Sequence, residues 1–184
     1  MQERNRTFSP GESELFWCQN CSLPLLSEKC SICNSSGQKI PLSPPGDVRL
    51  CFAKGRERLS DLFVQKYGCA DFLDGKVILL NKIAGIDRRD QVILDGRHIA
   101  TLWFDITSSS FNLDLESAGA VLLAKRAIRG FAKCQETMLK GHIKGKWLSP
   151  EYIESQPEGI SEGDNIVLKI GKYAGVGVVR RRGD

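Results

Sequence analysis

The sequence of 184 residues contains no long apolar run, only two histidines and no glycine-rich phosphate loop. Its longest uninterrupted apolar stretches, such as Val77 to Leu80, are far shorter than the roughly 20 residues that a membrane-spanning helix needs. The polar start, residues 1–6, lacks the apolar core of a signal peptide. We therefore expect a cytoplasmic protein without a membrane partner.

Support for nucleophilic catalysis is also missing. Cys51, Cys69 and Cys134 stand in apolar or turn contexts, and the two histidines, His98 and His142, are not adjacent to any of them in sequence. A catalytic thiolate needs a nearby base or another group that lowers its pKa. We expect three buried, inert thiols, and we assign no catalytic residue in this chain.

The overall composition is typical of a globular protein, with 41% hydrophobic and 26% charged residues. The formal net charge is +4. Such a mild excess permits nucleic-acid binding without requiring it, because phosphate binding depends on how positive charges cluster.

Four of the seven cysteines form two CxxC pairs inside sixteen residues, namely Cys18 with Cys21 and Cys30 with Cys33. An odd cysteine count concentrated near one end does not fit a secreted disulfide scaffold. A two-residue spacer lets both sulfurs of a turn reach one tetrahedral ion at about 2.3 Å, and two such turns complete a four-thiolate shell. The spacing predicts a structural zinc site, which leaves no open position for catalysis.

Two other interpretations of the same cysteines are open. They could be incidental buried thiols, or they could hold iron in a rubredoxin-like electron-transfer site. The segment 22–29 between the pairs is short, whereas a redox iron would be expected to lie under a long, aromatic-rich insertion. The segment is also too small to form its own core, so a metal must fold it.

The sequence divides into five parts that together predict an α+β fold. The predicted parts are an N-terminal tail (1–17), a four-cysteine knuckle (18–33), a Ser-, Pro- and Gly-rich linker (34–48), an α+β unit (49–130) and a small β-barrel (131–184).

Local signals place the main elements. Residues 60–68 have an N-cap serine, helical apolar spacing and a terminal glycine, and residues 116–130 contain strong helix formers. Asp95-Gly96 joins two apolar runs and favours a type I′ hairpin turn. Gly171-Lys172 likewise predicts a two-residue hairpin near the C-terminus. Strand periodicity favours core packing for Trp103 and Phe104, with stacking on bases as the alternative.

The third part carries a resemblance to a known family. The segments KGKWLSPEYI (144–153), GISEGDNIVL (159–168) and GVG (175–177) resemble a PUA domain, an RNA-binding module of RNA-modifying enzymes. The resemblance covers about 50 residues, and it departs from the family pattern where Glu151-Tyr152 follows Pro150. It implies a PUA-like β-barrel, which we expect to be truncated.

A second resemblance extends this one over nearly the whole chain. The segment VILLNKIAGIDRRDQVILDG (77–96), with Phe104-Asp105 beyond it, resembles the unit before the PUA domain in archaeal phosphoadenosine phosphosulfate (PAPS) reductase-like proteins. Those proteins also begin with a four-cysteine zinc knuckle and continue into a nucleotide α-hydrolase domain. No phosphate loop of that domain is visible here, so we expect this chain to be the N-terminal part, or a split version, of a longer protein.

The PUA resemblance also implies where RNA would bind. It places Lys140, His142, Lys144 and Lys146 on the RNA-contacting face, where lysines neutralise phosphates without reading bases. A solvated charged face is the alternative. To the charged cluster 87–90 we assign no chemistry.

These observations lead to two hypotheses. In the first, the chain is a zinc-containing module that binds structured RNA, with tRNA as the expected partner, and targets a PAPS reductase-like protein. In the second, these domains are the scaffold of a PAPS reductase oxidoreductase in sulfate assimilation and have no RNA role. The reaction of such a parent enzyme stays open between a PAPS reductase-like oxidoreductase and a tRNA sulfurtransferase.

Overall fold

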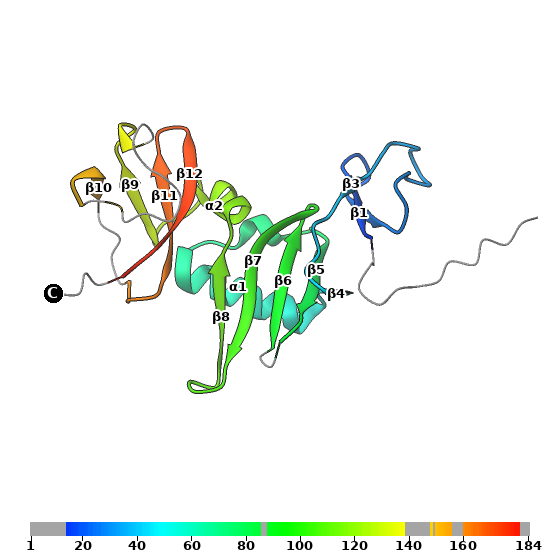
Figure 1. The fold of residues 1–184 in the computed structure, drawn as a ribbon, viewed down its shortest axis with the longest axis horizontal. Helices are drawn as coiled ribbons and strands as arrows, with labels where there is room; N and C mark the ends of the chain where they lie inside the picture. The colour runs from blue at the N-terminus through cyan, green and yellow to red at the C-terminus, as the bar shows by residue number, and fades with distance from the viewer. Residues whose placement is uncertain (1–13, 86–87, 139–147, 149, 156–159, 181–184) are drawn as a thin grey trace, which may run out of the picture.

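The computed structural model describes residues 14–85, 88–138, 148, 150–155 and 160–180. Within them the chain is a mixed α+β protein with two α-helices and three β-sheets (Figure 1). The predicted α+β class is therefore confirmed. No helix in this part of the chain is long and apolar enough to cross a membrane.

The first sheet is small and carries the cysteines. Its antiparallel strands β1 (Phe16–Cys18), β2 (Leu23–Leu25) and β3 (Gln38–Lys39) lie in the order β2-β1-β3. β1 begins within the predicted tail (1–17), and β3 lies in the predicted linker (34–48). Neither range is therefore only a connector, while the boundaries between domains stay predictions.

The second sheet is a five-stranded antiparallel meander. It contains β4 (Pro45–Leu50), β5 (Ile78–Ile83), β6 (Arg89–Leu94), β7 (Arg97–Asp105) and β8 (Ser110–Leu115), each paired with the next along the chain. This order leaves β4 and β8 as the edges.

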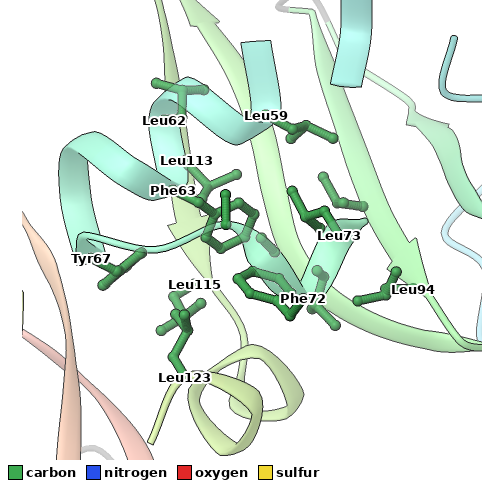
Figure 2. Close-up of a cluster of buried hydrophobic side chains, with 14 of the residues drawn as sticks. Leu59, Leu62, Phe63, Tyr67, Phe72, Leu73, Leu94, Leu113, Leu115 and Leu123 are labelled. Atoms are coloured by element: carbon green, nitrogen blue, oxygen red, sulfur yellow. The ribbon is translucent and has the colours of Figure 1, made fainter. Parts of the chain in front are cut away.

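Helices cover one face of this sheet and enclose the largest core. α1 (Ala53–Tyr67), the short 3-10 helix η1 (Asp71–Leu73) and α2 (Ser117–Leu123) supply apolar side chains that meet those of the strands (Figure 2). Phe63 and Phe72 meet edge to face, with ring centroids 5.0 Å apart. The fully buried members of this core include Leu59, Phe63, Tyr67, Val92, Ile99, Ala100, Leu113, Ala120, Leu123 and Val167.

Both helices differ in length from their predictions. α1 begins at Ala53 rather than near Ser60, and its N-cap Phe52 offers no side-chain hydrogen bond, so no capping signal marks the start. Gly68 ends α1 in the left-handed conformation with φ 78°, as predicted. α2 ends at Leu123, well before the predicted end at residue 130.

The third sheet belongs to the predicted barrel. It contains β9 (Phe131–Cys134), β10 (Ile153–Ser155), β11 (Asn165–Ile170) and β12 (Tyr173–Val178), in the order β10-β9-β11-β12, with β9 and β11 parallel. A short 3-10 helix, η2 (Pro150–Tyr152), precedes β10. Among the described residues the sheet is open, and no closed barrel is formed.

Both predicted hairpins are confirmed. The β6–β7 turn has φ 48° at Asp95 and φ 76° at Gly96, the two positive values that a type I′ turn requires. Gly171 has φ 54°, and Ile170 pairs with Tyr173 across the β11–β12 turn. Short-range turn chemistry therefore sets the pairing next to each turn, while an irregularity between Val92 and Ile93 shifts the register of β6 and β7 further along.

Trp103 and Phe104 do not lie in the core as expected. Both are half-buried and outside the buried clusters that the described residues form. Phe104 meets Phe111 at 5.0 Å between ring centroids. Trp103 follows the core residue Leu102, so strand alternation points its side chain away from the helices.

Candidate metal centre

Two similar turns bring the cysteines together. In the first turn the backbone N–H of Cys21 donates to Cys18 Sγ at 3.3 Å, and in the second the N–H of Asn34 donates to the carbonyl of Cys30 at 2.9 Å. The residue after each pair is left-handed, with φ 53° at Ser22 and φ 57° at Asn34. Such turns aim both sulfurs of a CxxC pair at a common point.

The sulfur positions fit a tetrahedral metal ion. The ligand atoms of Cys18, Cys21, Cys30 and Cys33 all lie within 4.8 Å of one another. Cys18 Sγ is 3.5 Å from Cys33 Sγ, and Cys30 Sγ is 3.8 Å from Cys21 Sγ. Four sulfurs bonded at 2.3 Å to one tetrahedral ion would stand about 3.8 Å apart. The four predicted ligands are therefore gathered in an arrangement that could hold a metal ion.

Ser35 favours the thiolate form on one side of the cluster. Its hydroxyl lies 2.9 Å from Cys33 Sγ and 3.4 Å from Cys18 Sγ. These contacts lower the pKa of Cys33 to about 6 and hold the pKa of Cys18 below its usual value. Hydrogen bonding to Cys33, followed by burial, raises the pKa of Cys21 to about 12. A thiol proton is thus retained at Cys21, which a bound cation would displace.

The cysteines themselves supply much of the interior of this small unit. Cys18 and Cys30 are buried with Leu25, and Phe16 and Leu23 pack against them from the edges. So few apolar side chains cannot offset the loss of chain entropy on folding, and metal bonds would have to supply the remainder. Metal binding and folding are expected to be one process in this segment.

The small sheet that carries the cysteines is anchored to the five-stranded sheet through Trp17. This residue directly precedes Cys18, is 1% exposed and packs in one cluster with Ile40, Leu79 and Ile93. It also lies against the β6–β7 turn, where a Cβ on Gly96 would stand 2.6 Å from Trp17 Cβ. Trp17 therefore connects the cysteine cluster directly to the sheet.

A network of side-chain hydrogen bonds holds Ser43, which lies in the segment between β3 and β4. The side chain of Asn81 donates to the carbonyl of Ser43 at 2.9 Å, and the N–H of Ser43 donates to Gln91 Oε1 at 2.7 Å. Gln91 Nε2 lies 3.3 Å from His98 Nδ1, and Thr101 Oγ1 lies 3.3 Å from His98 Nε2. Burial lowers the pKa of His98, so the neutral ring is favoured in this network.

The remaining predicted sites have different outcomes. Lys140, His142, Lys144 and Lys146 lie outside the described residues, so their RNA role stays a prediction. The three isolated cysteines are Cys51, Cys69 and Cys134, and each is buried or half-buried. Burial raises the pKa of each thiol, as expected for inert groups.

Trp17, Gly96 and Ser35 were not predicted as part of the site. Ser35 lies two residues beyond Cys33, so its proximity in sequence was a usable signal. Trp17 and Gly96 are 79 residues apart in the sequence and meet only in the folded chain. No local pattern could have paired them.

Comparison with known proteins finds long archaeal relatives. Uncharacterized protein MJ0066 of Methanocaldococcus jannaschii is 32% identical over 161 residues, which are 86% of this chain and 33% of that protein. Uncharacterized protein MJ0973 of the same organism is 32% identical over 109 residues, which are 58% of this chain and 24% of that protein. The chain thus spans a third or less of the length of these relatives. No protein-family profile and no solved structure matches it.

Proposed function

We propose that the four cysteines hold a structural Zn²⁺ ion and that the chain is an RNA-binding module of a longer protein, with tRNA as its expected partner. Four thiolates at tetrahedral spacing are the donor set that zinc prefers in closed sites. When bound, the ion would replace the missing core of the small unit. Its position beside Trp17 would then hold that unit in one orientation on the sheet.

Two neighbouring lysines on the third sheet carry the RNA part of the proposal. Lys133 of β9 and Lys169 of β11 are neighbours in register, so their side chains share one face. Neither forms an ion pair with another described residue, while the ammonium of Lys169 donates to the carbonyl of Ala127 at 3.1 Å and lies 3.6 Å from the ring centroid of Phe131. The pKa of Lys169 is lowered by burial and then by the charge of Lys133. A phosphate group near these two side chains would relieve their repulsion.

The lengths of the archaeal relatives support a modular role. This chain aligns with only a third of the first relative, so two thirds of that protein lie outside the alignment. A front-end module that positions a nucleic acid for another domain is consistent with this proportion. The resemblance to PAPS reductase-like proteins suggests a nucleotide α-hydrolase domain as that second part.

Binding of the zinc-loaded chain to total tRNA, compared with duplex DNA, tests the proposal over a salt series. We expect tRNA to bind more tightly and the affinity to fall as salt rises. Lys133→Ala and the pair Lys144→Ala/Lys146→Ala should each weaken binding, while Lys125→Ala, which changes an exposed lysine just after α2, serves as the matched control. Absence of binding at low salt would favour the scaffold role in a sulfate-assimilation oxidoreductase.

A further inference from the structure

A second concentration of positive charge lies at the end of the large sheet opposite the metal centre. The guanidinium carbons of Arg58 and Arg88 lie 4.0 Å and 5.3 Å from the ring centroid of Phe111. Arg58 comes from α1, Arg88 directly precedes β6, and Phe111 lies near the start of β8. The β6–β7 turn, against which Trp17 packs, is at the other end of these strands.

One nearby carboxylate, that of Asp90, is already neutralised. The carboxylate of Asp90 is 2% exposed, and Arg49 binds it at 2.7 Å. Arg88 reaches the same carboxylate only at 4.0 Å, and Arg58 forms no ion pair within the described part of the chain. Arg49 and Asp90 therefore form a close pair, and no carboxylate in the described part of the chain lies closer than 4.0 Å to the guanidinium of Arg58 or Arg88.

Stacking on Phe111 orients both guanidinium groups. A planar guanidinium held over an aromatic ring has fewer orientations, and its N–H groups at the ring's edge stay free to donate. The fork of N–H donors matches the oxygens of a phosphate group, which it can bind bidentately. Arg88 is 61% exposed, so a large ligand can reach it. Two like charges on one ring repel each other until an anion neutralises them.

We propose that Arg58 and Arg88 form a phosphate-binding clamp for the RNA backbone, an inference that rests on the proposed function. The clamp adds a contact point on the α+β unit, separate from the lysines of the third sheet. Its two cations contact phosphate and read no base, so they set affinity and orientation rather than sequence preference. A purely structural role, in which the arginines only cover Phe111, is the competing explanation.

Salt-dependent tRNA binding by an Arg58→Ala/Arg88→Ala variant of the zinc-loaded chain tests the clamp. Each lost phosphate contact makes the slope of log affinity against log salt shallower by about 0.7 to 0.9, so the double variant should lose about 1.4 to 1.8 in slope. Affinity at low salt should fall at least about tenfold, and an RNA of altered sequence should be affected equally. The matched control is Arg97→Ala, which removes an exposed arginine at the opposite end of the same sheet.

Two further measurements separate binding from folding. The single variant Arg88→Ala changes an exposed side chain, so it should fold normally. Its slope of log affinity against log salt should still decrease, by about half as much as in the double variant. Arg58→Lys/Arg88→Lys keeps both charges without the planar fork, and should retain most of the slope with weaker affinity.

The possible outcomes decide between the proposals. A double variant that matches the unaltered chain in affinity and slope overturns the clamp and leaves the proposed function intact. A lower melting temperature with an unchanged slope assigns the arginines a structural role only. If the unaltered chain binds no tRNA, both the proposed function and the clamp are wrong.

Discussion

The small cysteine unit and the five-stranded unit differ in what fills their interiors. The five-stranded unit and its helices contribute nine fully buried side chains to the largest core, whereas the interior of the cysteine unit, apart from Trp17 at its contact with the sheet, contains Leu25 and two of its own ligand candidates. Burial of apolar surface can hold the first, because the effect grows with the buried area. The second has too little apolar interior for this, so the proposed metal would have to supply the remainder. One chain thus sets a hydrophobic core beside a cluster of candidate metal ligands.

Removal of the metal should have the largest effect, and this effect should be confined to the cysteine unit. Zinc in small sites contributes about 10 to 16 kcal/mol of apparent binding free energy, which is also folding free energy. We expect a chelator, or Cys30→Ser, to unfold the cysteine unit while the α+β unit keeps its unfolding transition. In a Trp103→Phe/Trp147→Phe background, the fluorescence of Trp17 should shift to the red.

Amide hydrogen exchange provides the control for this experiment. Protection should be lost in β1 and β2 and kept in β6 and β7. A chelator that unfolds the whole chain in one step would show that the two units are not separately stabilised. An unchanged spectrum together with unchanged protection would show that no metal holds the cysteine unit.

A cavity in the largest core should instead destabilise the five-stranded unit and leave the cysteine unit unchanged. Phe63 is 0% exposed and meets Phe72, so Phe63→Ala should reduce the free energy of unfolding by about 3 to 5 kcal/mol. Val64→Ala on the exposed side of the same helix is the matched control and should change it far less. Urea unfolding measures both. Zinc affinity, measured by competition with a coloured chelator, should stay the same in the two variants.

The contact between the two units can be broken by one methyl group. Gly96→Ala places a Cβ against Trp17 at a residue with φ 76°, and Gly75→Ala adds one at φ 66° with no atom within 4 Å. Both variants bear the left-handed strain of about 1 to 2 kcal/mol, but only Gly96→Ala meets a neighbour. We expect zinc binding to survive in both, with Trp17 fluorescence changed only by Gly96→Ala. Equal spectra would contradict the proposed anchoring role.

The pH dependence of stability that arises from His98, in the hydrogen-bond network around Ser43, should be the smallest effect. Burial lowers the pKa of His98 below its usual value of 6.5, so the unfolded chain binds a proton more readily than the folded chain. Stability should therefore be complete above pH 6.5 and should decline as the pH falls below it. Urea unfolding between pH 8 and pH 5.5 measures this decline, which His98→Gln should reduce. A stability that rises on acidification would contradict the assignment.

Signals that act over a few residues predicted much of this structure. The CxxC spacing brought the four cysteines together in the prediction as in the fold, and Asp95-Gly96 predicted its turn because the two positions need positive φ. Where such a signal was missing, the prediction failed. Nothing in the side chain of Phe52 marks the start of α1, and Ser60, which looked like an N-cap, lies inside the helix.

The sequence by itself determined the α+β class, the four-cysteine cluster and both hairpins, because each depends on residues that are close along the chain. Tertiary structure decided how the cysteine unit sits on the sheet, through Trp17 and Gly96. It also decided which arginine pairs with the buried Asp90, since Arg49 rather than Arg58 reaches this carboxylate. Such contacts join distant segments, and their partners are set only when the sheet and helices pack together.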